Sequence, residues 1–452
     1  MKTDVLILGA GLAGLSTAHH LLGLGVRSRL VVEAKPTVGG VAGSVTKNGF
    51  TFDYTGHLLH LHDPYGKGYV LDLLKGNLAV HERRAAIFSK GVMTRYPFQA
   101  NTKGLPLGVV VDCVAGFLET VHRPSGPSKR GDFLSWCRAA FGDGITRHFM
   151  RPYNEKLWQT SLARMTTEWQ GRFVPKPSAT EVLYGALADQ NKRFGYNASF
   201  RYPVRGGIQA LPDALARRLE PGVVRTGARV TAVDLRWKVA QVAGLGEVRY
   251  ERLVNTLPLT TFLDLAGPLP DAVRQARGRL RWNAVWNLNL GVARPVVGDR
   301  HWVYFPEKKF PFYRVGFSSN FSSAAAPAGH SALYVEVARP GGARVDTAKL
   351  EVSILDGLRE AGILKKRDEI STMAWMPIPV GYVVYDFART PAVNAILRHL
   401  AKLGAQSIGR YGGWKYSFME ETLLDGKRCA ERLAGVASAR PAAAGGELQP
   451  LA

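Results

Sequence analysis

The feature that most constrains the fold is a glycine-rich turn near the amino terminus. Residues 4–25, DVLILGAGLAGLSTAHHLLGLG, predict a short apolar strand, a tight turn and a helix, with Gly9, Gly11 and Gly14 in a GxGxxG pattern. The first glycine permits the turn, the second lets the backbone approach a pyrophosphate, and the third lets the helix pack on the strand. A second strand ends in Glu33, nineteen residues after Gly14, where a carboxylate can accept from ribose hydroxyls. These features predict a dinucleotide-binding βαβ unit, with the pyrophosphate at the helix amino terminus.

Three further segments indicate which dinucleotide is bound. The stretch AKPTVGGVAGS, residues 34–44, resembles the glycine-rich segment that follows the ribose acid in FAD proteins of the amine oxidase and glutathione reductase-like superfamily. Residues 222–234 resemble the strand beside the adenine in that superfamily, and residues 408–433 resemble its carboxy-terminal FAD segment. The resemblance implies FAD as the cofactor. Besides the three turn glycines and Glu33, the residues expected at FAD are Gly39, Gly40, Val230, Arg410, Gly412 and Gly413.

The distance between these segments along the chain sets the expected organisation. The fold class is α/β, with a Rossmann-type FAD-binding domain built from discontinuous segments, a helical substrate-side domain and an antiparallel sheet. The FAD-binding domain is assigned to 1–90, 200–265 and 395–435, a mainly helical substrate domain to 91–199, and a substrate-binding sheet region to 266–394. The low-complexity residues 436–452 are expected to be a disordered tail.

Composition narrows the partners and the compartment. The chain has 59 Lys and Arg against 36 Asp and Glu, a net charge of +23, which favours anionic partners or a solvated basic surface. Because the basic residues are scattered, no nucleic-acid partner is expected. The three cysteines have no paired spacing, and the first residues form a strand and not an export signal, so a cytoplasmic location is expected. The most apolar run contains Asp112 and Glu119, so no membrane span is expected.

Arg314 raises a question about ligand charge. The stretch HWVYFPEKKFPFYRVGFSSN, residues 301–320, alternates as a half-buried strand does, and a lone guanidinium among its aromatic residues is costly to desolvate. A buried anion, above all a pyrophosphate that the planar guanidinium grips in a bidentate manner, would explain it. The alternative is an edge-strand arginine that reaches water past its apolar neighbours.

Two other interior stretches carry polar and aromatic groups suited to a site. In GHLLHLHD, residues 56–63, His57 and His60 are candidates to reach a flavin edge, and the alternatives are a metal site or satisfied buried histidines. In RYPFQANTKGLP, residues 95–106, Tyr96 or Phe98 offers a ring for base stacking, and the amide of Gln99 matches a pyrimidine edge. An aromatic strand end with a polar turn is the structural alternative. No metal ligand set is predicted.

Four motifs together resemble the UDP-galactopyranose mutase family, particularly its eukaryotic type. They are GHLLHLHD, RYPFQ, FMRPYNEKLWQ (149–159) and the stretch 301–320. The resemblance implies that His57, His60 and Arg314 are catalytic, with Arg314 on the nucleotide diphosphate. It also implies that the substrate is bound by Tyr96, Phe98, Gln99, Asn154, Trp158, Trp302, Tyr304, Asn320, Tyr385 and Tyr416.

Some positions of the resemblance are open or altered. Lys129 or Arg130 falls where these mutases have a diphosphate-binding arginine, and Tyr382 competes with Tyr385 for a diphosphate contact. Glu155 and Leu157 replace residues usual in mutases, and Ile208, Gln209 and Ala210 replace glycines that usually follow an RGG segment.

The resemblance implies an isomerase that interconverts pyranose and furanose forms of a UDP-sugar, UDP-galactose first, in cell-surface glycan biosynthesis. In that family N5 of the reduced flavin attacks the anomeric carbon, and the flavin–sugar adduct opens and recloses as the other ring size. FAD would act in its reduced form, with NAD(P)H or a reductase as electron donor, and a homo-oligomer is compatible with the resemblance. The alternatives are an FAD-dependent oxidase or desaturase, of the amine oxidase or protoporphyrinogen oxidase type, and a mutase-like enzyme acting on another nucleotide sugar.

Overall fold

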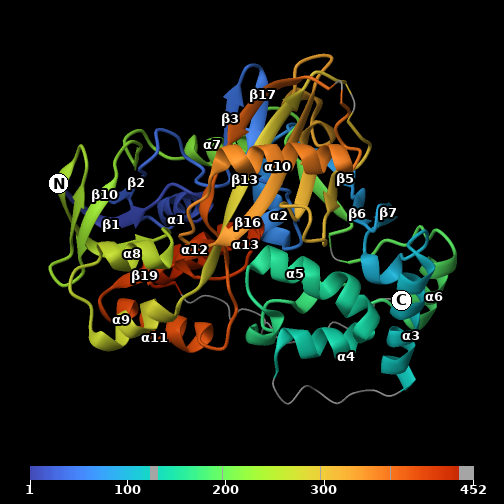
Figure 1. The fold of residues 1–452 in the computed structure, drawn as a ribbon. Helices are drawn as coiled ribbons and strands as arrows, with labels where there is room; N and C mark the ends of the chain where they lie inside the picture. The colour runs from blue at the N-terminus through green and yellow to red at the C-terminus, as the bar shows by residue number, and fades with distance from the viewer. Residues whose placement is uncertain (123–130, 196, 296, 367, 437–452) are drawn as a thin grey trace.

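The computed structural model describes residues 1–122, 131–195, 197–295, 297–366 and 368–436. Within these residues the fold is mixed α/β, built around two large sheets with helices packed on them (Figure 1). The predicted Rossmann-type fold class is therefore confirmed. Residues 437–452 of the expected disordered tail, and the pair Lys129 and Arg130, lie outside the described residues.

The first sheet contains the glycine turn. Strand β1 (Lys2–Leu8) pairs in parallel with β2 (Arg29–Val32) and with β12 (Gly246–Asn255). Among the described residues the strand order is β10-β11-β12-β1-β2-β9, and β19 pairs with β12. Its other strands are β9 (Val224–Arg225), β10 (Val230–Asp234), β11 (Val239–Val242) and β19 (Ala405–Ser407). Strands from both ends and from the middle of the chain thus share one sheet, in which β1 lies between β12 and β2 and β19 pairs with β12.

Helix α1 (Leu12–Gly23) follows the turn and packs against the carboxy-terminal helix α13 (Met419–Leu433). A Cβ on Gly14 would lie 2.0 Å from the carbonyl oxygen of Gly9, so only glycine lets the helix begin this close to the strand end. Gly9 itself has φ +98°, a left-handed conformation that favours glycine. The turn thus requires two glycines for different reasons: Gly9 for its backbone conformation and Gly14 for the close approach of the helix to the strand end.

The second sheet is largely antiparallel. Its long central strands are β13 (Trp282–Val292) and β16 (Ser331–Pro340), and the order is β17-β13-β16-β15-β14-β6-β7 with β18 paired to β13. Figure 1 shows α10 (Thr347–Glu360) lying across this sheet, where it covers a buried apolar cluster. Strand β6 (Ala85–Ser89) belongs to this sheet through β14, although residues up to 90 were assigned to the FAD-binding domain.

The remaining elements are the other strands of the second sheet, two two-stranded sheets (β3 with β4, and β5 with β8) and the other helices. The strands are β3 (Ser44–Lys47), β4 (Phe50–Asp53), β5 (Ala79–Glu82), β7 (Val92–Arg95), β8 (Ser199–Tyr202), β14 (Trp302–Tyr304), β15 (Arg314–Phe317), β17 (Ile370–Trp375) and β18 (Ile378–Val383). The helices are α2 (Pro64–Leu73), α3 (Leu107–His122), α4 (Phe133–Ile145), α5 (Arg151–Trp158), α6 (Ala179–Leu187), α7 (Ala210–Ala216), α8 (Leu259–Leu265), α9 (Asp271–Arg279), α11 (Arg389–Lys402) and α12 (Gly409–Gly412).

Helices α3 to α6 form a group beside the second sheet (Figure 1). Helix α4 is preceded by Asp132, whose carboxylate accepts from the N–H of Ser135 at 2.9 Å and so caps the helix. A π-helical turn, Thr146–Met150, joins α4 to α5. The apolar side of this group is buried around Phe117, Phe133 and Trp158, which holds α5 in place.

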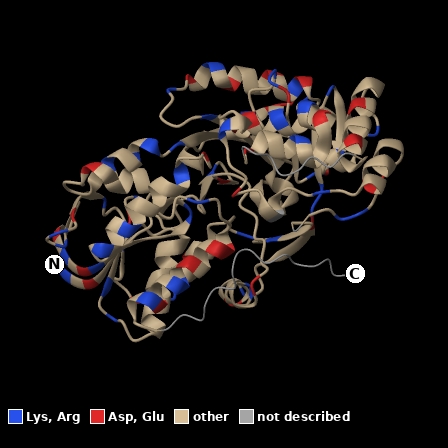
Figure 2. Cartoon of the chain, turned by 90° about the horizontal axis from the view of Figure 1, so that it is seen from below, with Lys and Arg blue, Asp and Glu red and all other residues tan. Residues whose placement is uncertain are grey.

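Charge is spread over the surface. Figure 2 shows Lys and Arg distributed over the elements with Asp and Glu among them, and not gathered into one patch. Among the described residues, no helix combines the length and apolar character that crossing a bilayer requires.

Asp53 gives a pH-dependent contribution to folding. Its side chain is buried and accepts from Ser44 Oγ and Tyr202 Oη at 2.6 Å each, and burial raises its pKa from 3.8 to about 6. Between pH 4 and 6 the unfolded chain therefore releases this proton before the folded protein does, so this term lowers the free energy of unfolding as the pH rises. We expect the advantage of wild type over Asp53→Asn to shrink by about 2–3 kcal/mol between pH 4 and 7.

Urea unfolding of the two proteins at several pH values measures this difference. A difference between them that does not change with pH would contradict the account of Asp53.

Candidate active site

A cavity of about 980 Å³ opens between the two sheets and helix α5. Its lining comes from the glycine turn, the histidine loop, α5, β14 to β18 and the turn before α13. The predicted site residues that line it are Gly9, Gly11, Glu33, Gly39, Gly40, His57, His60, Tyr96, Gln99, Asn154, Trp158, Trp302, Tyr304, Arg314, Arg410 and Tyr416. The volume lies in the range of small-molecule and cofactor sites.

The glycine turn forms one end of the cavity. Gly11 lies on the lining, and a Cβ added to it would meet nothing within 4 Å, so this backbone is open toward the cavity. The helix α1 begins at the next residue and presents its amino terminus to the same space. The Glu33 carboxylate accepts from the N–H groups of Ala10 and Lys35, each at 2.9 Å, which fixes it beside the turn. An open glycine backbone, a helix amino terminus and a held carboxylate fit a dinucleotide.

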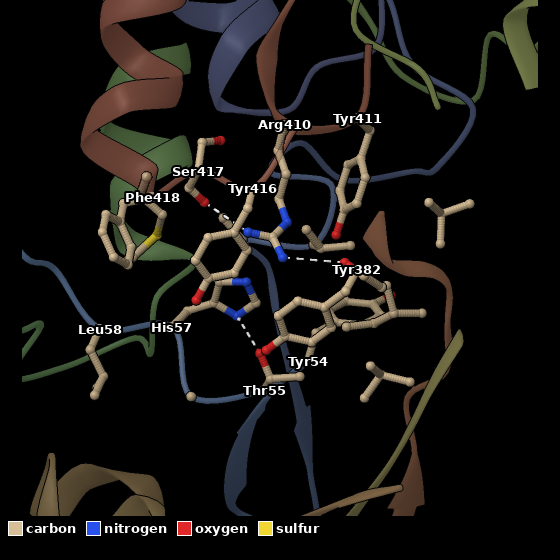
Figure 3. A pocket seen from close by; sticks show the side chains of 18 of the residues that line it. Tyr54, Thr55, His57, Leu58, Tyr382, Arg410, Tyr411, Tyr416, Ser417 and Phe418 are labelled. Atoms are coloured by element: carbon tan, nitrogen blue, oxygen red, sulfur yellow. Dashed lines mark hydrogen bonds between the residues drawn. The ribbon is translucent and has the colours of Figure 1, made fainter. Parts of the chain in front are cut away.

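Arg410 forms another part of the cavity wall. It donates to the carbonyl oxygens of Ser417 at 2.8 Å and Gly381 at 3.3 Å. Its guanidinium lies 5.1 Å from the ring centre of Tyr382 and 5.0 Å from that of Tyr416 (Figure 3). The backbone turn thus places a cation between two aromatic rings on the cavity wall.

Four of the residues predicted at FAD are not on the lining. Val230 is buried in β10, and a Cβ on Gly412 would lie 2.7 Å from the carbonyl oxygen of Asn255, so that glycine packs on the end of β12. Gly413 also lies behind the wall, and Gly409 and Tyr411 line the cavity beside Arg410. The carboxy-terminal turn glycines therefore shape the chain without facing the cavity. Gly14 is likewise a packing residue, as its predicted role requires.

The two predicted histidines lie on the lining and are neutral. Burial and the nearby Arg410 lower the pKa of His57 to about 4, and its Nδ1 is 3.3 Å from Thr55 Oγ1 (Figure 3). Burial also lowers the pKa of His60 to about 4. At neutral pH both rings can exchange hydrogen bonds without carrying a charge, so of the neutral and cationic forms the structure favours the neutral one.

Arg314 lies on the lining but is not a lone cation. Its Nε and Nη2 donate to the two carboxylate oxygens of Glu336 at 2.9 Å and 2.6 Å. The two residues are direct partners across β15 and β16, and Glu336 is fully buried. The premise that this guanidinium is alone is therefore wrong, because Glu336 is its partner, while its contact with a ligand diphosphate stays a prediction. The sequence signal was Glu336 itself, the one acidic residue in the apolar strand SALYVEVARP.

Tyrosines surround Arg314. Tyr304, Tyr382 and Tyr416 line the cavity, as do three that sequence reasoning missed, Tyr153, Tyr313 and Tyr334. Burial raises the pKa of Tyr153, Tyr304, Tyr313, Tyr334 and Tyr416, so their hydroxyls stay protonated at neutral pH. The only sequence signal for Tyr153 was its place beside Asn154, and Tyr313 directly precedes Arg314. A set of neutral O–H donors around one cation suits an anionic ligand.

Of the three residues predicted to bind the base, two line the cavity and one does not. Tyr96 lines the cavity with its ring 5.6 Å from that of Tyr304. Gln99 also lines it, and its Nε2 donates to the carbonyl oxygen of Pro175 at 2.7 Å. Phe98 is fully buried and not on the lining; its ring stacks at 4.8 Å on that of Phe149, which does line the cavity. Of the two rings considered for stacking, the structure places only Tyr96 at the cavity.

Two further substrate-binding predictions are not met. Asn320 is not on the lining, and its Nδ2 donates to the carbonyl oxygens of Gly298 at 2.8 Å and Arg300 at 2.6 Å. Tyr385 also lies behind the wall, where its hydroxyl accepts the N–H of Tyr416 at 2.8 Å. Of the competing tyrosines, Tyr382 is the one that reaches the cavity.

Most of the altered positions are not on the cavity lining. Glu155, Ile208, Gln209 and Ala210 are absent from the lining, and only Leu157 is on it. Glu155 pairs with Arg151 on the same helix, at 3.3 Å. In the described part of the chain, no group of three or more His, Cys, Asp or Glu side chains is placed to hold a metal ion.

Comparison with known proteins identifies the class. Residues 12–434 match the family described as flavin containing amine oxidoreductase. The chain belongs to this family, so it is a flavin oxidoreductase-family enzyme with a flavin cofactor.

Among solved structures, that of reduced UDP-galactopyranose mutase is 26% identical, with a TM-score of 0.89, and the match covers 96% of this chain and 94% of that chain. The resemblance predicted from the four motifs is therefore confirmed. Cyclohexylamine oxidase from Brevibacterium oxydans IH-35A (15% identical, TM-score 0.66) and wild-type putrescine oxidase bound to putrescine (17%, TM-score 0.64) share the fold, each match covering 96% of this chain and 99% of theirs.

Proposed function

We propose that this enzyme is an FAD-dependent nucleotide-sugar mutase that interconverts the pyranose and furanose forms of a UDP-sugar, with UDP-galactose as its substrate. The observation that carries the proposal is the position of Arg314 and its tyrosines on the same cavity as the glycine turn. The similarity to reduced UDP-galactopyranose mutase over 96% of the chain supports it.

The cofactor would be held at the glycine end of the cavity. Gly11 and the amino terminus of α1 would receive the pyrophosphate of FAD, and Glu33 the adenosine ribose. His57 and Arg410 would lie at the ring system, where a neutral imidazole and a fixed cation tune its electronics. Reduced FAD supplies the nucleophilic chemistry at the sugar, while NAD(P)H or a reductase would provide the electrons.

The substrate would be held by groups on the facing walls. Tyr96 and Gln99 would receive the uracil, by stacking and by amide hydrogen bonds. The diphosphate would meet Arg314, with Glu336 behind the guanidinium to hold its plane, and the hydroxyls of Tyr304, Tyr382 and Tyr416. Asn154 and Trp158 on α5 would bound the sugar.

These residues would act through electrostatics and orientation. When the diphosphate leaves the sugar, negative charge grows on its oxygens, and a preorganised guanidinium and neutral O–H donors stabilise that charge. With the nucleotide and the sugar each held on the cavity walls, the leaving diphosphate would stay in position to return to the rearranged sugar. We place this reaction in the cytoplasm and in the synthesis of cell-surface glycans.

Ligand-dependent thermal unfolding of the flavin-loaded protein tests the proposal against an amine oxidase function. We expect UDP and UDP-galactose to raise the melting temperature, because a ligand at 100 times its Kd stabilises the native state by about 2.7 kcal/mol. Putrescine and cyclohexylamine should have no effect. Stabilisation by the amines and not by UDP would favour the oxidase, and stabilisation by another nucleotide sugar alone would move the proposal to that substrate.

A further inference from the structure

One buried lysine connects two walls of the cavity. Lys156 lies on α5, and its Nζ donates to the carbonyl oxygens of Phe305 at 2.8 Å, Phe310 at 3.0 Å and Phe312 at 3.1 Å. It also donates to the carbonyl oxygen of Glu307. Four backbone carbonyls of one loop, residues 305–312, therefore converge on a single nitrogen of a helix far away in the sequence.

The loop that Lys156 holds sits between two cavity residues. Tyr304 ends β14 directly before the loop, and Tyr313 and Arg314 follow it at the start of β15. On the other side, α5 carries Tyr153, Asn154 and Trp158 on the cavity lining. Lys156 thus links the loop beside Tyr304 and Arg314, which are proposed to bind the diphosphate, to helix α5, which carries the residues proposed to bind the sugar.

We propose that Lys156 is a positioning residue for substrate binding, whose ammonium holds the loop 305–312 so that Tyr304 and Arg314 face the residues of α5. The inference rests on the proposed function in so far as it takes UDP as the ligand. The effect of Lys156 on the loop does not depend on that function. Lys156 itself does not line the cavity, so it acts through the residues that do.

The arrangement requires the charged form of Lys156. An ammonium has three N–H donors for the four carbonyl oxygens, whereas a neutral amine has two and turns a lone pair toward an oxygen. The carbonyls that lose their donor are buried, so their hydrogen bonds are costly to leave unmade. Loss of the proton should therefore loosen the loop.

The surroundings place this change near neutral pH. Burial lowers the pKa of Lys156 to about 7, and the carboxylate of Glu307 opposes that decrease. Glu307 is itself paired with Lys90 at 3.5 Å. The other charged groups of the two elements are paired: Arg151 with Glu155 on α5, and Lys309 with Glu360 and, at 3.9 Å, with Glu307. Lys308 completes the charges of the loop, and Tyr153 and Tyr313 stay protonated.

Hydrogen–deuterium exchange on the wild-type flavin-loaded protein tests the loop without any substrate. After correction for intrinsic rates, we expect the amides of Phe305, Phe310 and Tyr313, which donate to backbone carbonyls, to lose protection as the pH rises from 6 to 8.5, while those of β13 do not. In Lys156→Met, which keeps the length of the side chain without its donors, the loop should be unprotected at every pH. Unchanged protection in wild type across this range, or in the variant, would overturn the inference.

The affinity for UDP, measured by calorimetry, is the second test of Lys156. Lys156→Met should bind UDP about tenfold more weakly than wild type at pH 6.5, since hydrogen bonds from a charged donor are lost, and the difference should vanish by pH 9. Lys308→Met, on the same loop, is the matched control and should behave as wild type. If wild type itself fails to bind UDP, the proposed function fails, and the exchange data still decide the role of Lys156. Equal pH profiles of UDP binding in wild type and Lys156→Met would refute the role of Lys156.

Discussion

Arg314→Ala should lose UDP-sugar turnover almost entirely, and it should also be less stable than wild type. Removal of a preorganised cation from a developing negative charge costs about 3–4 kcal/mol of transition-state stabilisation, a factor of 10² to 10³ in rate. The change also leaves the fully buried Glu336 carboxylate without its partner. Breaking a buried ion pair in this way costs about 3–5 kcal/mol of folding free energy. Steady-state kinetics and chemical denaturation measure the two losses separately.

A second variant separates chemistry from folding. In Arg314→Met/Glu336→Gln both charges are removed, so no buried charge is left unpaired, and we expect most of the stability to return. Turnover should remain as low as in Arg314→Ala. If the double variant regains activity together with stability, Arg314 has only a structural role and its assignment to the diphosphate is wrong.

Gly11→Ala should fold normally and fail to retain flavin. A Cβ at Gly11 meets no protein atom within 4 Å and points into open cavity, where the proposed pyrophosphate would lie. Overpacking of this kind costs about 1–3 kcal/mol, which corresponds to roughly a 5- to 150-fold loss of affinity. The flavin content of the purified protein, its 450 nm absorbance and its circular dichroism are the measurements.

Two other glycines serve as controls for this prediction. Gly14→Ala places a Cβ 2.0 Å from the carbonyl oxygen of Gly9, so this variant should be destabilised before any cofactor binds. Gly108→Ala lies at the start of α3 with nothing within 4 Å, and should retain flavin and stability. Full flavin occupancy in Gly11→Ala would mean that the pyrophosphate does not lie at this turn.

The sequence identifies the parts of the fold that depend on local physics. The GxGxxG turn determines its own strand, helix and carboxylate, because each glycine has a steric task that no other residue performs. The motifs at residues 56–63, 95–106 and 301–320 also correctly predicted that His57, Tyr96 and Arg314 line one cavity. What sequence could not supply is the direction of each side chain at the end of a motif. Phe98 and Asn320 lie within correctly recognised stretches, yet one turns into the apolar core and the other caps loop carbonyls.

The larger omission concerns partners across strands. Glu336 and Arg314 are 22 residues apart and meet only because β15 and β16 pair in one register. Lys156 reaches a loop about 150 residues further along the chain. No local pattern predicts either contact, since each depends on how the second sheet and α5 are placed together. The turn residues Gly412 and Gly413 show the same limit, because a glycine that shapes a wall need not face the cavity.

The proposal as a whole is tested most directly by turnover without oxygen. The flavin-loaded protein is reduced with dithionite and given UDP-galactofuranose, and the products are separated by chromatography. We predict conversion to UDP-galactopyranose with no net change in the redox state of the flavin, and no conversion by the oxidised protein. No isomerisation by the reduced protein, with peroxide formed from an amine by the oxidised protein in air, would contradict the account.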